Sequence, residues 1–175
     1  MADFDIAFQW TMQFEDTQMA CAQVPDAAPA GCAGPCYAIS GINSGAWPTE
    51  FDSIAALPQA SRVPAVEAFY QVHFWNKWFG QLNSDEVAKR VFDFAVNGGS
   101  GTAVKTLQQA VNALGGNLTV DGGWGPHTVS AVNAADPDAL VKAFIAARTA
   151  HYQAIVAANP ADARYLKGWL ARAQS

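Results

Sequence analysis

Glu15 is the first residue of the chain whose position suggests chemistry. It follows an apolar stripe in which Ala7, Trp10 and Phe14 recur at helical spacing, which predicts a helix over residues 4–18. An acid is unfavourable near the C-terminal end of a helix, because the helix dipole favours cations there. A locally unfavourable residue often marks a functional site. A glutamic acid against apolar walls can hold its proton near neutral pH, so general acid catalysis is the chemistry that Glu15 could perform. The alternative is an ordinary solvated glutamate at the end of a helix.

General acid catalysis is often shared with a second carboxyl group, and the sequence offers several. Asp26 is the favoured candidate because it lies in an irregular segment that can fold towards Glu15, although an aspartate there is also an ordinary turn former. Asp16 is expected to point elsewhere, because successive side chains on a helix diverge. Glu50 and Asp52 are weaker candidates. Catalysis by a single acid with a positioned water is the remaining alternative.

Aromatic side chains are abundant, and some of them could stack on flat apolar faces of a ligand such as sugar rings. The candidates are Tyr37, Tyr70, Trp75 and Trp78. An aromatic stripe at helical spacing more often belongs to a core, so each of these residues has a packing role as its alternative.

The three cysteines, Cys21, Cys32 and Cys36, lie within sixteen residues. An odd number cannot pair completely within one chain, so we expect one local disulfide and one free thiol, with a fully reduced set as the alternative. A metal site is not expected, because no histidine lies near them to complete four ligands.

Composition excludes several classes of protein. The chain has 175 residues, a net charge of −5 and no basic run, which argues against a nucleic-acid partner. No stretch of about 18 apolar residues is present, so no membrane span is expected. The N-terminus lacks the basic start and apolar run of a secretory signal. No cofactor is indicated, and we expect a monomer.

Periodicity predicts a mainly α fold with one long irregular loop or small β-hairpin over residues 21–49. The Asp136-Pro137 and Asn159-Pro160 pairs are strong signals for the starts of the last two helices. Asn83 with Glu86 fits a capping pair. The composition changes near residue 98, which divides the chain into lobes 1–98 and 99–175. The other predicted helices span residues 64–79, 84–96 and 101–114.

Six segments, taken in order, resemble the glycoside hydrolase family 108 muramidases and their C-terminal peptidoglycan-binding region. The match closest to letter for letter is Phe-Asp-Phe-Ala-Val-Asn at residues 92–97, and the Asp-Gly-Gly-Trp-Gly-Pro-His-Thr segment at 121–128 is similar to the binding region. The other four are the helix that ends at Glu15, Tyr-Ala-Ile-Ser at 37–40, Tyr-Gln-Val-His-Phe-Trp at 70–75 and Tyr-Leu-Lys-Gly-Trp-Leu-Ala-Arg at 165–172.

The resemblance implies a lysozyme-like catalytic lobe over 1–98 and a peptidoglycan-binding lobe over 99–175. It implies that Glu15 is the acid that cleaves the β-1,4 bond between N-acetylmuramic acid and N-acetylglucosamine. Asn97 could bond an N-acetyl group or cap its helix, and Trp124 could reach glycan or simply pack. The substrate-binding residues that we expect are Tyr37, Ser40, Tyr70, Trp75, Asn97 and Trp124.

The resemblance also implies that peptidoglycan glycan strands are the partner. Without a leader, such an enzyme would reach the periplasm or cell wall as a phage endolysin or as an antibacterial effector of a machine such as type VI secretion. An effector would require an immunity protein in the producing cell. The family usually has two glycines after its glutamate, whereas Asp16 and Thr17 stand here. This difference motivates the alternative of a non-catalytic peptidoglycan-binding protein.

Overall fold

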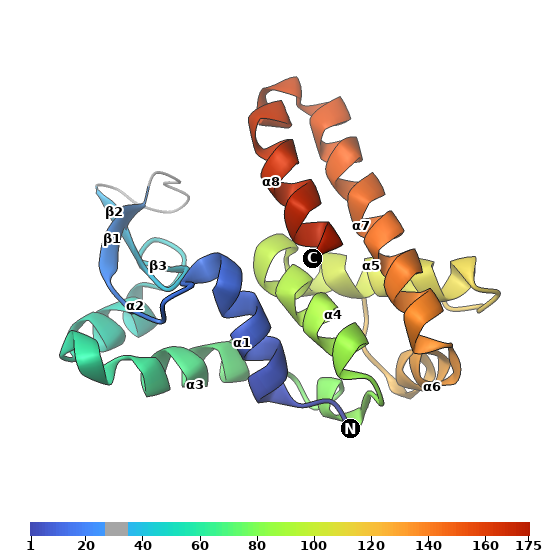
Figure 1. Cartoon of the computed structure of the whole chain (residues 1–175), viewed down its shortest axis with the longest axis horizontal. Coiled ribbons are helices and arrows are strands. Elements are labelled where there is room, and N and C mark those ends of the chain that lie inside the picture. Colours follow the sequence, from blue (N-terminus) through green and yellow to red (C-terminus); the bar gives the residue numbers. More distant parts are fainter. Residues whose placement is uncertain (27–34) are drawn as a thin grey trace. The chain divides into compact units, whose positions relative to one another are not determined.

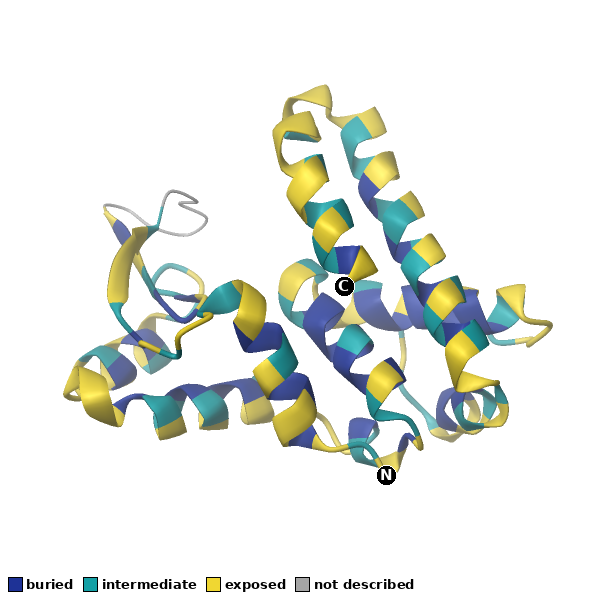
Figure 2. Ribbon diagram, viewed as in Figure 1, coloured by how far each residue is buried: buried dark blue, intermediate teal, exposed yellow. Residues whose placement is uncertain are grey.

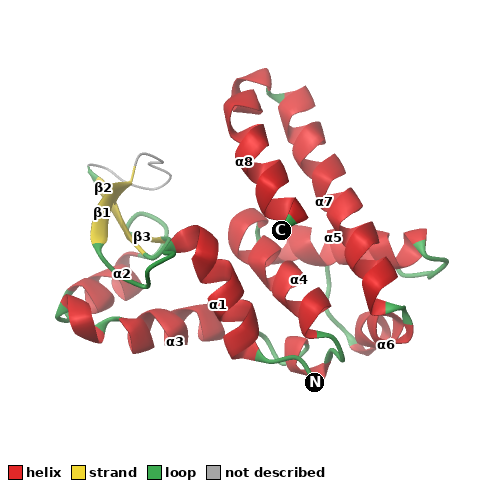
Figure 3. Cartoon of the chain, viewed as in Figure 1, coloured by secondary structure: helices red, strands yellow, loops and turns green. Residues whose placement is uncertain are grey.

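A computed structural model describes residues 1–26 and 35–175 (Figure 1). The described residues are mainly helical and include a small antiparallel sheet, as predicted (Figure 3). The helices are α1 (Phe4–Glu15), α2 (Pro48–Ala55), α3 (Val63–His73), α4 (Asp85–Gly98), α5 (Ser100–Ala113), α6 (Pro126–Ala134), α7 (Pro137–Ala158) and α8 (Ala163–Gln174). The strands are β1 (Gln23–Asp26), β2 (Cys36–Ile39) and β3 (Ile42–Asn43). Short 3-10 turns occur at Gln59–Ser61, Phe79–Gln81 and Pro160–Asp162.

The chain forms two compact units. The sheet-bearing unit comprises Phe8–Trp75, and the helical unit comprises Met1–Ala7 and Asn76–Ser175. The composition change at residue 98 falls inside the helical unit, between α4 and α5, which pack against each other. The assignment of catalytic and binding lobes to 1–98 and 99–175 stays a prediction about function.

The sheet-bearing unit is built around a tight hairpin. Its strands run in the order β1-β2-β3, and Ile39 of β2 pairs with Ile42 of β3. The two residues between them, Ser40 and Gly41, have φ angles of +47° and +80°. Two successive positive φ angles are typical of the type I′ turn, whose twist matches that of the flanking strands. The hairpin predicted for residues 21–49 is therefore present, and the buried Ile39 and Ile42 side chains fix its register.

Three predicted helices are shorter than expected. The last one begins at Ala163 and not at Pro160, because Pro160–Asp162 forms a 3-10 turn. Helix α1 ends at Glu15 and not at 18, and Met19 and Cys21 beyond it have positive φ angles. Helix α3 ends at His73 and not at 79. There the side chain of Asn76 accepts a hydrogen bond from the backbone N–H of Trp78, an Asx turn that competes with helix continuation.

The helical unit packs α5 against α4 and α7, and α8 against α7. Figure 2 shows α4 largely buried, whereas α8 is mostly exposed. The Asp136 carboxylate caps α7 by accepting from the Ala139 N–H at 2.8 Å, as predicted. The predicted cap of α4 was wrong by one residue. The hydroxyl of Ser84, and not the side chain of Asn83, accepts from the Val87 N–H. The core consists of side chains such as Phe92, Phe94, Leu107, Leu140 and Phe144.

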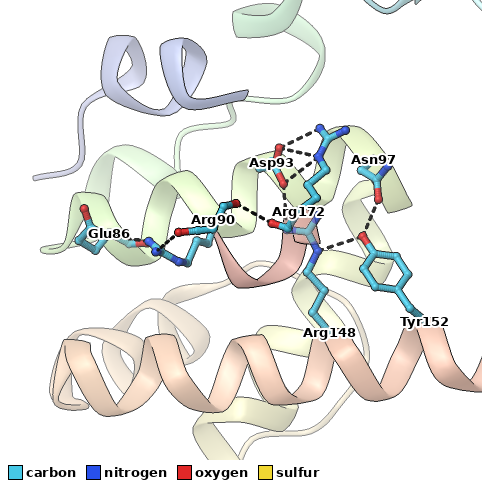
Figure 4. Close-up of polar contacts among 8 residues, drawn as sticks. Glu86, Arg90, Asp93, Asn97, Arg148, Tyr152 and Arg172 are labelled. Carbon is cyan, nitrogen blue, oxygen red and sulfur yellow. Dashed lines mark hydrogen bonds and ion pairs between the residues drawn. The ribbon is translucent and has the colours of Figure 1, made fainter. Parts of the chain in front are cut away.

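A buried ionic network joins α4, α7 and α8 (Figure 4). The Asp93 side chain is fully buried and accepts from Arg148 Nη1 and from Arg172 Nη2, each at 2.8 Å. Arg148 also donates from Nε to the Tyr152 hydroxyl at 3.0 Å, and this hydroxyl donates to Asn97 Oδ1 at 2.5 Å. Because the Asp93 carboxylate accepts from guanidinium groups of two other helices, it joins α7 and α8 to α4.

We predict that Asp93→Asn lowers the free energy of unfolding by about 3–5 kcal/mol, because removal of one partner leaves buried charge uncompensated. Urea unfolding followed by circular dichroism measures the effect. Asp138→Asn is the matched control, since Asp138 is exposed in the first turn of α7. Equal unfolding midpoints for the two variants would show that the network contributes nothing to stability.

Candidate active site

A pocket of about 280 Å³ lies within the sheet-bearing unit, at the end of α1 and beside β1 and the β2–β3 turn. The carboxyl groups of Glu15 and Asp26 both belong to its lining, so the structure brings together the two acids that the sequence nominated. The full lining is Glu15, Asp16, Ala22, Val24, Pro25, Asp26, Ala38, Ser40 and Gly41.

The absence of a side chain at Gly41 leaves room for the Glu15 carboxyl. A Cβ atom at Gly41 would lie 2.6 Å from Glu15 Oε2 and 2.8 Å from the Tyr70 hydroxyl oxygen. No side chain larger than hydrogen fits there without displacing one of these groups. The positive φ of Gly41 also favours glycine. Glycine at this position of the type I′ turn therefore lets the backbone lie closer to the Glu15 carboxyl than a residue with a side chain would allow.

Tyr70 holds this turn through a buried hydrogen bond. Its side chain is 2% exposed, and its hydroxyl donates to the Ser40 carbonyl oxygen at 2.7 Å. Its ring lies 5.7 Å from that of Phe8 and 5.4 Å from that of Phe69. The ring is therefore packed in the core of the unit, and the hydroxyl positions the backbone beside Glu15.

Asp16 corrects an expectation. We expected its side chain to point away from Glu15, but it lines the same pocket. The expectation failed because α1 ends at Glu15, so the divergence of neighbouring side chains on a helix does not apply. The Asp16 carboxylate accepts from the Ser40 hydroxyl and the Cys21 N–H, each at 2.7 Å, and from the Ala20 N–H at 3.1 Å.

These bonds determine the charge of Asp16. Partial burial would raise the pKa of its carboxyl, but the hydrogen bonds from Ser40, Cys21 and Ala20 outweigh that effect and lower its pKa below the ordinary value. Asp16 is therefore a fixed anion at neutral pH, and its oxygens link the loop after α1 to the β2–β3 turn.

Asp26 lies at the end of β1 and is oriented by Asn43. The side-chain amide nitrogen of Asn43 donates to Asp26 Oδ2. The side-chain oxygen of Asn43, Oδ1, accepts from the backbone N–H groups of Gly45 at 2.7 Å and Ala46 at 3.1 Å. Asn43 is thus held by the backbone and in turn holds the carboxylate. Sequence reasoning missed this residue, because nothing in the local pattern separates it from an ordinary turn asparagine.

The other expected substrate-binding residues are not part of this pocket. Tyr37 is exposed on β2, and Trp75 is half-buried just beyond the end of α3. Two belong to the helical unit: Asn97 accepts from Tyr152, and Trp124 packs against Phe79 with ring centroids 5.1 Å apart. Of that group, only Ser40 lines the pocket with Glu15.

The cysteines fit the expected mixed state where they are described. Cys36 is disulfide-bonded, and Cys21 is a buried free thiol. Cys32 lies outside the described residues. Within residues 1–26 and 35–175, no group of three or more His, Cys, Asp or Glu side chains is arranged to hold a metal ion, and no helix is long and apolar enough to cross a bilayer.

Comparisons with known proteins found a family match for part of the chain and a similar solved structure. Residues 102–174 match a family described as "Predicted Peptidoglycan domain". Among solved structures, the chain is similar to one titled "Structure of Brucella abortus SagA", with a TM-score of 0.67 and 23% sequence identity over 98% of this chain and 89% of that chain. Curated protein sequences gave no match. The family match supports a peptidoglycan-related function. The structural similarity shows the fold, which is mainly α with a small hairpin, as expected.

We predict that Gly41→Ala destabilises the protein more than backbone strain alone explains. Alanine at a positive φ costs about 1–2 kcal/mol, and the collision with Glu15 and Tyr70 adds about 1–3 kcal/mol. Gly115→Ala is the control, because Gly115 has a φ of +92° but open space around it. Thermal unfolding of both variants measures the difference. Equal losses would mean that the Glu15 carboxyl is not confined by the turn.

Proposed function

We propose that the protein is an N-acetylmuramidase that hydrolyses the β-1,4 bond between N-acetylmuramic acid and N-acetylglucosamine, as its resemblance to glycoside hydrolase family 108 implies. The observation that carries the proposal is the shared pocket of Glu15 and Asp26. Two carboxyl groups on one pocket are the constellation that glycoside hydrolysis requires. The peptidoglycan family match over residues 102–174 supports the same polymer as substrate.

In this mechanism Glu15 protonates the glycosidic oxygen as the bond to the anomeric carbon breaks. The sugar then acquires oxocarbenium character, and negative charge in the pocket stabilises it. Asp26 is the second group, positioned by Asn43 to act on water or on the anomeric carbon. Asp16 adds a permanent negative charge, because its hydrogen bonds lower its pKa.

Preorganisation of these groups supports the assignment. The Asp16 carboxylate accepts from Ser40 and the Asp26 carboxylate from Asn43. The Glu15 carboxyl lies against the backbone of Gly41. Groups that are held before the substrate binds need little reorganisation during the reaction. Substrate contacts by Tyr37 and Trp75 belong to the proposal, since both rings are at least partly accessible. Trp124 is a further candidate in the helical unit.

The proposed setting is the cell wall or periplasm. An enzyme of this kind would be delivered as a phage endolysin or as a secreted antibacterial effector. An effector would be accompanied by an immunity protein that blocks the pocket in the producing cell. We expect the enzyme to act as a monomer.

We predict that Glu15→Gln lowers the rate of peptidoglycan hydrolysis by about 10²–10⁴-fold, the usual contribution of a general acid. Purified sacculi are digested, and the released muropeptides are identified by mass spectrometry, with new reducing ends on N-acetylmuramic acid as the diagnostic product. Glu67→Gln is the matched control, because Glu67 lies on α3 in the same unit and outside the pocket.

Equal release by Glu15→Gln and the native protein would reject Glu15 as the acid. If neither protein releases product but both pellet with sacculi, the alternative of a non-catalytic binding protein is favoured.

We predict that Asp26→Asn lowers the same rate by about 10²-fold or more, because an amide can neither activate water nor bond to the anomeric carbon. Asp52→Asn, an exposed change on α2, is the control and is expected to leave the rate unchanged. Circular dichroism establishes that both variants fold. Native rates for Asp26→Asn would favour catalysis by Glu15 with a positioned water.

A further inference from the structure

The helical unit contains a second hollow that the proposed hydrolysis does not use. Its volume is about 490 Å³, and it lies between α5, the segment 117–121 and α6. Its lining includes the polar residues Asn117, Thr119, Asp121 and His127. These residues fall within the part of the chain that matches the peptidoglycan family.

Asp121 is the fixed charge of this hollow. Its Oδ1 atom accepts from the Gly123 N–H at 2.7 Å and from Gln108 Nε2 at 2.8 Å. Gln108 is 1% exposed, and its own carbonyl oxygen accepts from the Gly122 N–H at 2.9 Å. The hydrogen bonds from Gln108 and Gly123 lower the pKa of Asp121, so it is ionised at neutral pH.

The second oxygen of this carboxylate is available to a ligand. In the described part of the chain, the hydrogen bonds from Gln108 and Gly123 both fall on Oδ1, and Asp121 is exposed at the hollow. Lys105 is the nearby cation and also lowers the pKa of Asp121. Its stem lies along Gly122, and among the described residues it makes no ion pair with Asp121.

A second hollow of about 550 Å³ adjoins the polar one and is lined mostly by apolar residues. Ala131 and Ala134 of α6 line both, so the two are adjacent along that helix. Glycines and further alanines supply much of the second lining, together with Val111, Leu114 and Asp136, whose carboxylate caps α7. We call the two hollows together the α6 groove. It has Asp121 in the first hollow, Asp136 in the second, and the small side chains of Ala131 and Ala134 shared by both.

The lining of the α6 groove distinguishes between the two components of peptidoglycan. No Phe, Tyr or Trp is among the residues that line it, so a sugar ring finds no flat aromatic face to stack upon. Peptide stems, in contrast, combine alanines with a diamino acid that carries a side-chain ammonium group. Alanine methyl groups suit a surface of small residues, and an ammonium group suits an ionised carboxylate.

We propose that the α6 groove binds the peptide stem of peptidoglycan, with Asp121 accepting hydrogen bonds from the ammonium group of the diamino acid. The stem's alanine residues pack over Ala131 and Ala134. This inference rests on the proposed function only in taking peptidoglycan as the substrate. It does not depend on Glu15, because every residue of the groove belongs to the helical unit.

The test uses the full chain and a sugar-free tetrapeptide stem that contains lysine, with its Nε-acetylated form as the uncharged counterpart. Isothermal titration calorimetry measures the affinities of the native protein, Asp121→Asn and the control Asp138→Asn. We expect Asp121→Asn to weaken binding of the lysine peptide about threefold to tenfold, as for a partly exposed charge-assisted contact. Acetylation should weaken binding to the native protein by a similar factor but have little further effect on Asp121→Asn, because both changes remove one interaction.

The outcomes separate this inference from the proposed hydrolysis. Independent, multiplicative effects of acetylation and Asp121→Asn would overturn the pairing of Asp121 with the ammonium group. Binding of a peptide-free glycan strand at the groove, with no binding of the stem, would overturn the assignment to peptide. A stem that binds as described while Glu15→Gln hydrolyses normally would leave the groove assignment standing and reject Glu15 as the acid.

Discussion

The two-residue turn at Ser40 and Gly41 is the constraint on which the pocket of the sheet-bearing unit depends. The buried Tyr70 hydroxyl holds its backbone from one side, and Asp16 holds the Ser40 hydroxyl from the other. Asp16 also accepts from the backbone N–H of Cys21, so one carboxylate joins the segment that leaves α1 to the β2–β3 turn. Glu15 precedes Asp16 in the chain and lies against Gly41, and its position therefore follows from these bonds.

Two acids adjacent in sequence thereby acquire different surroundings. Asp16 accepts from a hydroxyl and from backbone N–H groups, which stabilise its anion and lower its pKa. Glu15 lies against the glycine backbone and lines the pocket. Asp16, which stands where the resembling family usually has a glycine, thus helps to build the pocket.

Local signals were sufficient where the decisive interaction is local. The stripe before Glu15, the Asp136 cap and the turn residues of the 21–49 segment each express short-range preferences, and the corresponding elements formed. The position of Asp16 and the bond from Asn43 to Asp26 depend on contacts between residues 17 or more positions apart, which no local period encodes. Asn97 illustrates the same limit, because its partner Tyr152 lies 55 residues away.

Both units use the same physical device to present a carboxyl group. In each, a buried polar side chain on a helix secures a turn that contains a glycine of positive φ: Tyr70 secures Gly41, and Gln108 secures Gly122. Burial of a hydroxyl or an amide is costly unless its hydrogen bonds are made, so each turn is held in the one geometry that satisfies them. A carboxyl group at such a turn has little freedom to reorganise, which suits proton transfer at Glu15 and recognition of a cation at Asp121. The two proposed activities therefore rest on one structural principle, applied separately in two compact units of the chain.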